Sequence, residues 1–197
     1  MKITLHTSML LVALTLLLSA CSDDTKTQWM NLNEAWTAFE AEQYDLAASE
    51  FLSAVDQNNQ HAEAWCGLGW SRAMLEAEEG LDYREAVLDA FHQADALAPS
   101  YVDAFAGLAL YHSASVDTLQ ALEWSLDVLS TGGLHWQFAH RSDVNSRAMH
   151  KIAAWNLFKL QRYTECLTQV QFVFPSFQPL VESEDFLDLL FAQMGQI

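Results

Sequence analysis

Apolar residues recur at helical spacing along almost the whole chain, and no stretch alternates apolar and polar residues as a strand would. Glycine is scarce, and there are only three prolines, so long segments contain no helix breaker. Pro99 follows one apolar-periodic segment, and Gly132-Gly133 follows the next, so both positions mark predicted helix ends. The pattern predicts an all-α fold.

Two pairs of segments repeat along the chain. Ala64–Trp70 aligns with Ala104–Leu110, because both read Ala, aromatic, small, Gly, Leu, small. Gln43–Val55 aligns with Arg162–Val170, each with a Tyr near its start. Such internal similarity is typical of stacked helical hairpins, which need about three or more units to bury a continuous core.

These segments resemble the two helices of a tetratricopeptide repeat, and the resemblance covers Gln28–Phe174. The small residue of each first helix falls at Ala35, Gly69, Ala109 and Ala154. The successive spacings are 34, 40 and 45 residues, and only the first equals the family period of about 34. We therefore expect insertions at Glu78–Asp82 and around Thr131–Ser142.

The resemblance implies a short α-solenoid of tetratricopeptide-like helix-turn-helix repeats, ended by a C-terminal capping helix. Ser183-Glu184-Asp185 should open that last helix with a capping residue and first-turn acids. Its Phe186, Leu189, Leu190 and Met194 are predicted to form one buried face.

The first 20 residues are predicted to be a secretory signal. Lys2 precedes the apolar run Met9–Leu18, and the small residues Ser19 and Ala20 follow it. Ten helical residues extend about 15 Å, roughly half the thickness of a hydrocarbon core. The run is therefore too short for a comfortable transmembrane helix.

The run from Leu18 to Cys21 reads Leu-Ser-Ala-Cys and resembles the lipobox of bacterial lipoproteins. The resemblance implies cleavage before Cys21 and acylation of this residue, including palmitate. By resemblance to enterobacterial lipoprotein sorting, Ser22 in the next position implies the outer membrane, with the body on the periplasmic face, and the inner membrane is the alternative. Residues 21–27 would then form a lipidated tether, and residues 28–197 would form the repeat domain. An ordinary signal with a chance cysteine is the alternative.

The formal net charge of −17 becomes −18 when Lys2 leaves with the signal. So acidic a chain is a poor candidate for binding nucleic acid or for gripping anionic lipid electrostatically. Cys66 and Cys166 could form a disulfide in an oxidising compartment, but two buried small residues are the favoured interpretation.

Tetratricopeptide-like repeats bind partners on the concave side, which the first helices line. The resemblance assigns these groove positions to Trp36, Phe39, Cys66, Trp70, Leu110, Lys151, Trp155, Phe158 and Lys159. An aromatic groove for an apolar peptide or helix is one interpretation. The other is that these aromatic residues are core, covered by the C-terminal helix or by a long loop.

Basic residues concentrate late in the chain, at Arg141, Arg147, Lys151, Lys159 and Arg162. Lys151, Trp155 and Lys159 share one helix face, because they lie four residues apart. The cluster could hold an acidic chain end or loop of a partner. Pairing with the protein's own acids is the alternative.

The insertion Leu134–Asp143 contains two histidines and two aromatic residues. His135, His140 and His150 lack tight ligand spacing, so no metal or other cofactor is expected. We expect instead a loop packed over the last hairpin, with Trp136 and Phe138 buried. No catalytic constellation of known order is present in the sequence.

These observations favour a membrane-anchored periplasmic scaffold that binds an envelope protein through its concave groove. Pilus-assembly and cell-wall machinery are candidate partners by analogy alone. One alternative is an envelope enzyme or metal-binding protein that uses the His135–His150 region. Another is a structural protein whose groove is filled by its own C-terminal helix.

Overall fold

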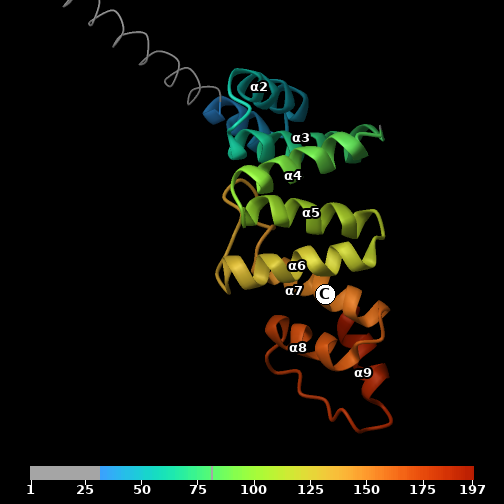
Figure 1. The fold of residues 1–197 in the computed structure, drawn as a ribbon. Coiled ribbons are helices and arrows are strands. Elements are labelled where there is room, and N and C mark those ends of the chain that lie inside the picture. Colours follow the sequence, from blue (N-terminus) through green and yellow to red (C-terminus); the bar gives the residue numbers. More distant parts are fainter. Residues whose placement is uncertain (1–31, 81) are drawn as a thin grey trace, which may run out of the picture.

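Helical hairpins follow one another along the chain and stack into a short solenoid (Figure 1). This computed structural model describes residues 32–80 and 82–197, so the predicted signal, Cys21 and the tether lie outside the described residues. Within them, the regular structure is helical apart from one isolated β-bridge between Gln137 and Asn145.

The helices pair in sequence order. Residues 32–40 form the helix that precedes α2. The remaining helices are α2 (Tyr44–Gln57), α3 (Ala62–Glu79), α4 (Arg84–Leu97), α5 (Val102–Ala114), α6 (Thr118–Gly132), α7 (Ser146–Lys159), α8 (Tyr163–Val173) and α9 (Phe186–Met194). The predicted helix ends at Pro99 and Gly132-Gly133 are confirmed, because α4 ends at Leu97 and α6 ends at Gly132.

Close approach of the helices depends on small residues facing large ones. Phe91 of α4 is fully buried between α3 and α5. A Cβ atom built at Gly69 of α3 would lie 2.8 Å from the Phe91 ring, and one at Gly107 of α5 would lie 2.3 Å from it. The four predicted small positions, Ala35, Gly69, Ala109 and Ala154, are all buried. The chain is thus an α-solenoid of tetratricopeptide-like hairpins, as predicted.

The buried side chains form two hydrophobic clusters. The larger extends from Leu32 to Met149 and includes the first three hairpins. The smaller joins the last hairpin to α9, where Cys166 Sγ lies 3.8 Å from Met194 Sδ. The predicted capping helix is confirmed, and it packs against the end of the last hairpin.

Two details of α9 differ from the prediction. Leu189 is 46% exposed, whereas Phe186, Leu190 and Met194 are buried as expected. Asp185 occupies the N-cap position but its side chain makes no capping hydrogen bond. The buried face is narrower than predicted because α9 contacts the body along a single stripe.

Cys66 and Cys166 are free and buried. Burial raises the pKa of the Cys166 thiol to about 12 and raises the pKa of Cys66 well above its usual value. Both behave as small core residues, which agrees with the favoured interpretation of the sequence.

Candidate interaction surface

The segment 134–145, which we call the strap, connects α6 to α7 and crosses back over the earlier repeats. Its backbone closes on itself: the N–H of Phe138 donates to Val144 O at 2.9 Å, and the N–H of Ser146 donates to Trp136 O at 2.9 Å. The Asn145 side chain then accepts from the N–H of Ala148 and caps α7. The strap is therefore an ordered loop with both ends fixed to helices.

Two strap rings pack on the tryptophans of the first helices. Phe138 is fully buried and stacks on Trp70 with a centroid distance of 4.8 Å. His140 stacks on Trp36 at 3.7 Å with an interplanar angle of 2°. His140 Nδ1 also lies 2.8 Å from Glu40 Oε1. These contacts hold the strap against the first helices of the first two repeats.

The indole N–H groups of these tryptophans are satisfied by the next repeat. Trp36 Nε1 donates to Glu63 Oε1 at 2.9 Å, and Trp70 Nε1 donates to the backbone O of Asp103 at 3.1 Å. Trp136 of the strap donates to Asp103 Oδ1 at 3.2 Å. Burial raises the pKa of the Asp103 carboxyl, and the hydrogen bond from Trp136 opposes that rise.

Sequence reasoning missed this role of Glu63 and Asp103. Both occupy the same place in the aligned segments, directly before Ala64 and Ala104. An acid repeated at one register position was the available signal. The Glu63 carboxylate links Trp36 to the following first helix, whereas the Asp103 carboxylate holds Trp136 of the strap and Trp70 bonds to the Asp103 backbone.

The structure buries the predicted groove residues of the first two repeats. Trp36 is 6% exposed, Phe39 2% and Trp70 3%, and Cys66 is fully buried. This is the alternative in which a long loop covers the aromatics. The strap was expected over the last hairpin, and that expectation was wrong, because its aromatic rings fit between Trp36 and Trp70. Phe138 is buried as predicted, and Trp136 is half-buried.

The remaining groove residues lie on α5 and α7. Leu110 and Trp155 are half-buried, and Lys159 is exposed. Lys151 Nζ donates to the backbone O of Ile197 at 3.0 Å, so a residue beyond α9 reaches the groove. Phe158 packs on Phe191 of α9 with a centroid distance of 5.7 Å. The strap and the α9 region thus both pack on predicted groove residues.

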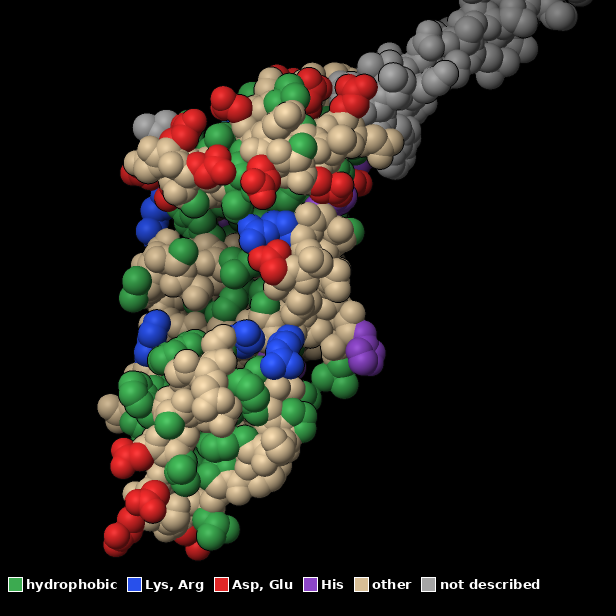
Figure 2. All heavy atoms as spheres, turned by 180° about the vertical axis from the view of Figure 1, so that it is seen from behind, with side chains coloured by type: hydrophobic (Ala, Val, Ile, Leu, Met, Phe, Trp, Pro, Cys, Tyr) green, Lys and Arg blue, Asp and Glu red, His purple; other side chains and the backbone are tan. Residues whose placement is uncertain are grey.

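Basic side chains gather across the middle of the face in Figure 2, and acids dominate its two ends. Arg141 pairs with Asp143 at 2.6 Å, and Arg162 pairs with Glu165 at 2.5 Å. These pairs support, for these two residues, the interpretation that the cluster pairs with the protein's own acids. No ion pair among the described residues involves Lys159.

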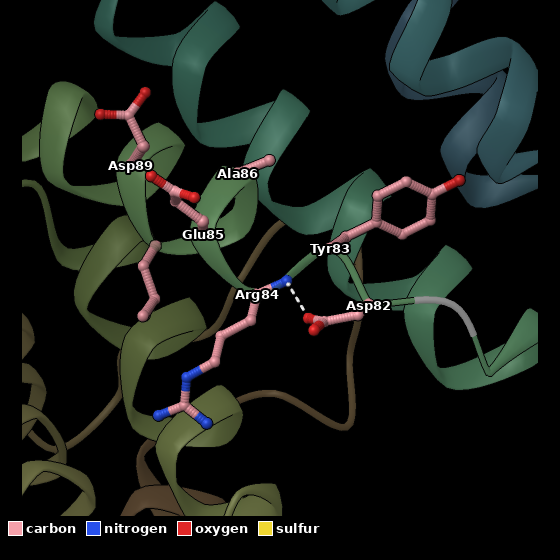
Figure 3. A pocket seen from close by; sticks show the side chains of 7 residues that line it. Asp82, Tyr83, Arg84, Glu85, Ala86 and Asp89 are labelled. Carbon is pink, nitrogen blue, oxygen red and sulfur yellow. Dashed lines mark hydrogen bonds between the residues drawn. The ribbon is translucent and has the colours of Figure 1, made fainter.

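Several cavities open on the surface of the described residues. One of about 420 Å³ lies beside the strap, lined by Phe39, Glu40, Glu42, Tyr44, Met74, His140, Arg141, Ser142 and Asp143. Another of about 940 Å³ lies at the start of α4, lined by Asp82, Tyr83, Arg84, Glu85, Ala86, Leu88 and Asp89. Figure 3 shows the Arg84 side chain directed away from the carboxylates of Glu85 and Asp89, which lie toward the same side.

The three histidines of the predicted alternative site lie apart. His135 is exposed, His140 stacks on Trp36, and His150 pairs with Gln169. Among residues 32–80 and 82–197, no group of three or more His, Cys, Asp or Glu side chains could hold a metal ion. In the same part of the chain, no helix combines the length and apolarity needed to cross a bilayer.

Comparison with known proteins supports the fold. No protein-family model matches the chain, and no curated protein matches it in sequence. A crystal structure of MamA protein is similar, with a TM-score of 0.59 and 18% sequence identity. The similarity covers 80% of this chain and 81% of that one. MamA is a tetratricopeptide-like helical repeat protein, so the chain shares the fold of a solenoid built from such hairpins.

Proposed function

We propose that this chain is a non-enzymatic interaction scaffold, anchored through Cys21 to the periplasmic face of the bacterial outer membrane. The observation that carries the proposal is the tetratricopeptide-like solenoid, an architecture that offers stacked helix surfaces to protein partners. Cys66, Tyr101 and Asp103 belong to the packing between repeats rather than to a reaction cavity.

The accessible part of the groove lies on α5 and α7. The strap covers Trp36 and Trp70, so these residues could meet a partner only if the strap moved. Leu110, Trp155 and Lys159 keep some exposure. An exposed lysine next to half-buried apolar side chains suits an acidic segment of an envelope protein. Components of pilus assembly and of cell-wall machinery remain the candidate partners, by analogy.

The anchor is tested by Cys21→Ser. If Cys21 carries the acyl chains, the variant should leave the membrane fraction, because each buried CH₂ contributes about 0.8 kcal/mol to membrane binding. Immunoblots of membrane and soluble fractions from the native cells measure the distribution. Cys66→Ser is the matched control and should stay with the membranes. Full retention of the Cys21→Ser protein would refute the anchor.

The binding surface is tested by Lys159→Glu. The charge reversal should weaken capture of an acidic partner by about 1 kcal/mol, roughly fivefold, with the loss shrinking at high salt. Cross-linking of the full chain in its own membranes, followed by quantification of the cross-linked partner, measures the effect. Arg84→Glu on α4 makes the same charge change away from the groove and should not reduce capture. Equal loss in both variants would mean that net charge, not the groove, governs binding.

A further inference from the structure

The last part of the chain exposes a group of large apolar side chains. Leu180, Val181, Leu187, Leu189 and Phe191, here called the terminal patch, are 77%, 46%, 44%, 46% and 59% exposed. They lie on α9 and on the turn before it, where the N–H of Ser183 donates to Leu180 O at 3.0 Å. Surface apolar residues are common singly, but a local concentration of this kind is typical of an interaction site.

The packing of α9 explains why these residues face outward. Its Phe186, Leu190 and Met194 supply the buried stripe. Leu187 and Phe191 are four residues apart and lie on one flank of that stripe, and Leu189 lies on the other. A helix apolar on more than one side normally has a second neighbour. Within the described residues, the body contacts α9 through the last hairpin alone.

Acids surround the terminal patch. Glu182, Glu184, Asp185 and Asp188 are all exposed and alternate in sequence with its apolar residues. None of the ion pairs among the described residues involves them. Figure 2 shows hydrophobic side chains at this end of the molecule, with Asp and Glu at its tip. The patch therefore combines an apolar centre with a negative rim.

The charge and position of the patch decide among the possible occupants. A second copy would bring the same four acids against themselves, which like-charge repulsion disfavours. Figure 1 places α9 at the opposite end of the solenoid from the helix at 32–40. Under the proposed function, the anchor precedes residue 32, so the patch points away from the membrane. A bilayer is therefore a poor occupant, and a protein partner fits better.

We infer that the terminal patch docks an amphipathic helix of a protein partner, with an apolar stripe flanked by Lys or Arg. The stripe covers Leu187 and Phe191, and the basic flanks face Glu184 and Asp188. The inference rests on the proposed scaffold function and adds a second contact, separate from the groove on α5 and α7. The scaffold would then hold two partner segments of opposite charge at different places along its length.

A peptide of defined chemistry tests this inference. The probe is a fluorescein-labelled 14-residue helix with a leucine stripe and lysine flanks, and the matched probe has glutamate in place of lysine. Fluorescence anisotropy measures binding to the full chain in phosphatidylcholine nanodiscs, with empty nanodiscs as the baseline. We expect binding of the lysine probe in the micromolar range and at least about tenfold weaker binding of the glutamate probe, because charge complementarity favours the first.

Variants locate the binding to the patch. Leu187→Asp should weaken binding of the lysine probe at least about tenfold. Asp188→Lys should weaken it severalfold. Leu52→Asp on α2 is the matched control, since Leu52 is 40% exposed and Leu187 is 44% exposed. Circular dichroism confirms that each variant keeps its helices. If Leu187→Asp melted the helix, Asp188→Lys alone would carry the test.

Four results would overturn the inference. Equal binding of the two probes would remove the charge argument, and equal loss in Leu187→Asp and Leu52→Asp would remove the patch from the binding site. Concentration-dependent dimerisation abolished by Leu187→Asp would assign the patch to a second copy. None of these results involves Cys21 or Lys159. A chain that keeps its anchor and its groove binding but ignores the lysine probe would refute this inference and leave the scaffold proposal standing.

Discussion

At the scale of single residues, hydrogen bonds from the indole N–H groups of buried tryptophans help to fix how neighbouring repeats pack. Trp36 and Trp70 each place an indole in the core and give its N–H to the first turn of the next repeat, at Glu63 and Asp103. Leaving such an N–H unpaired in a buried site would cost about 1–3 kcal/mol. Glu63 through its carboxylate and Asp103 through its backbone carbonyl thus contribute to the register between repeats.

His150 is a residue whose burial should make stability depend on pH. Its Nδ1 lies 2.7 Å from Gln169 Oε1, and its Nε2 is buried without a hydrogen-bond partner. Burial lowers the pKa of His150 below its usual value of 6.5. The unfolded chain therefore binds more protons than the folded chain once the pH falls below about 6.5, so stability is lost as the pH falls.

We expect the free energy of unfolding to fall between pH 7.5 and pH 5.5, and to fall less in His150→Gln. Urea unfolding followed by circular dichroism at both pH values measures the difference. His135→Gln, at an exposed position, is the control and should keep the wild-type pH dependence. An identical pH dependence in wild type and His150→Gln would show that this histidine carries no linked proton.

At the scale of elements, Phe91 between Gly69 and Gly107 makes helix packing unusually sensitive to one methyl group. A Cβ atom at Gly107 would lie 2.3 Å from Phe91 Cζ, closer than real Cβ contacts allow. Gly107→Ala should lower the free energy of unfolding by about 1–3 kcal/mol, because overpacking outweighs the gain in helix propensity. Urea unfolding measures the change.

Gly195→Ala provides the control for this substitution. The nearest atom to a Cβ at Gly195 is 3.5 Å away, and the residue has φ −65°. The free energy of unfolding of the Gly195→Ala protein should stay within about 0.5 kcal/mol of wild type. A Gly107→Ala protein as stable as Gly195→Ala would mean that α4 and α5 can move apart without loss.

The elements show why the sequence predicted the helices better than the site. Periodicity and the small residues Ala35, Gly69, Ala109 and Ala154 depend on contacts within and between adjacent hairpins, which local sequence encodes. The position at which the strap packs depends on how all the hairpins are arranged, and local sequence patterns do not encode that arrangement. Groove and core positions also share one helical spacing, so Trp36 and Trp70 fitted both interpretations until the position of Phe138 was known.

At the scale of the whole molecule, charge is unevenly distributed and mostly uncompensated. The formal net charge of the full chain is −17. Among the described residues, the carboxylate–guanidinium pairs are Arg141–Asp143 and Arg162–Glu165, both between residues close in sequence. Such local surface pairs contribute little to stability. Repulsion among the acids should therefore outweigh the attraction within these ion pairs. Salt, which screens both, should then stabilise the fold.

Raising sodium chloride from about 20 mM to about 300 mM should raise the melting temperature by a few degrees, because the Debye length falls from about 20 Å to about 6 Å. Thermal unfolding followed by circular dichroism measures the shift. Potassium chloride should give the same result, since ionic strength is the cause. A melting temperature that falls with salt would show that attractive ion pairs dominate.

The strap also changes how such a chain can acquire its structure. In most repeat arrays each unit contacts only its neighbours, so folding can spread from one end. Here His140 pairs with Glu40, 100 positions earlier in the sequence. A ribosome adding about 5–20 residues per second needs about 5–20 s between these two residues. During that interval the strap does not yet cover Trp36 and Trp70. A nascent chain that ends before Phe138 would therefore be a substrate for chaperones. Folding of the first two repeats would become cooperative only after the strap has been synthesised.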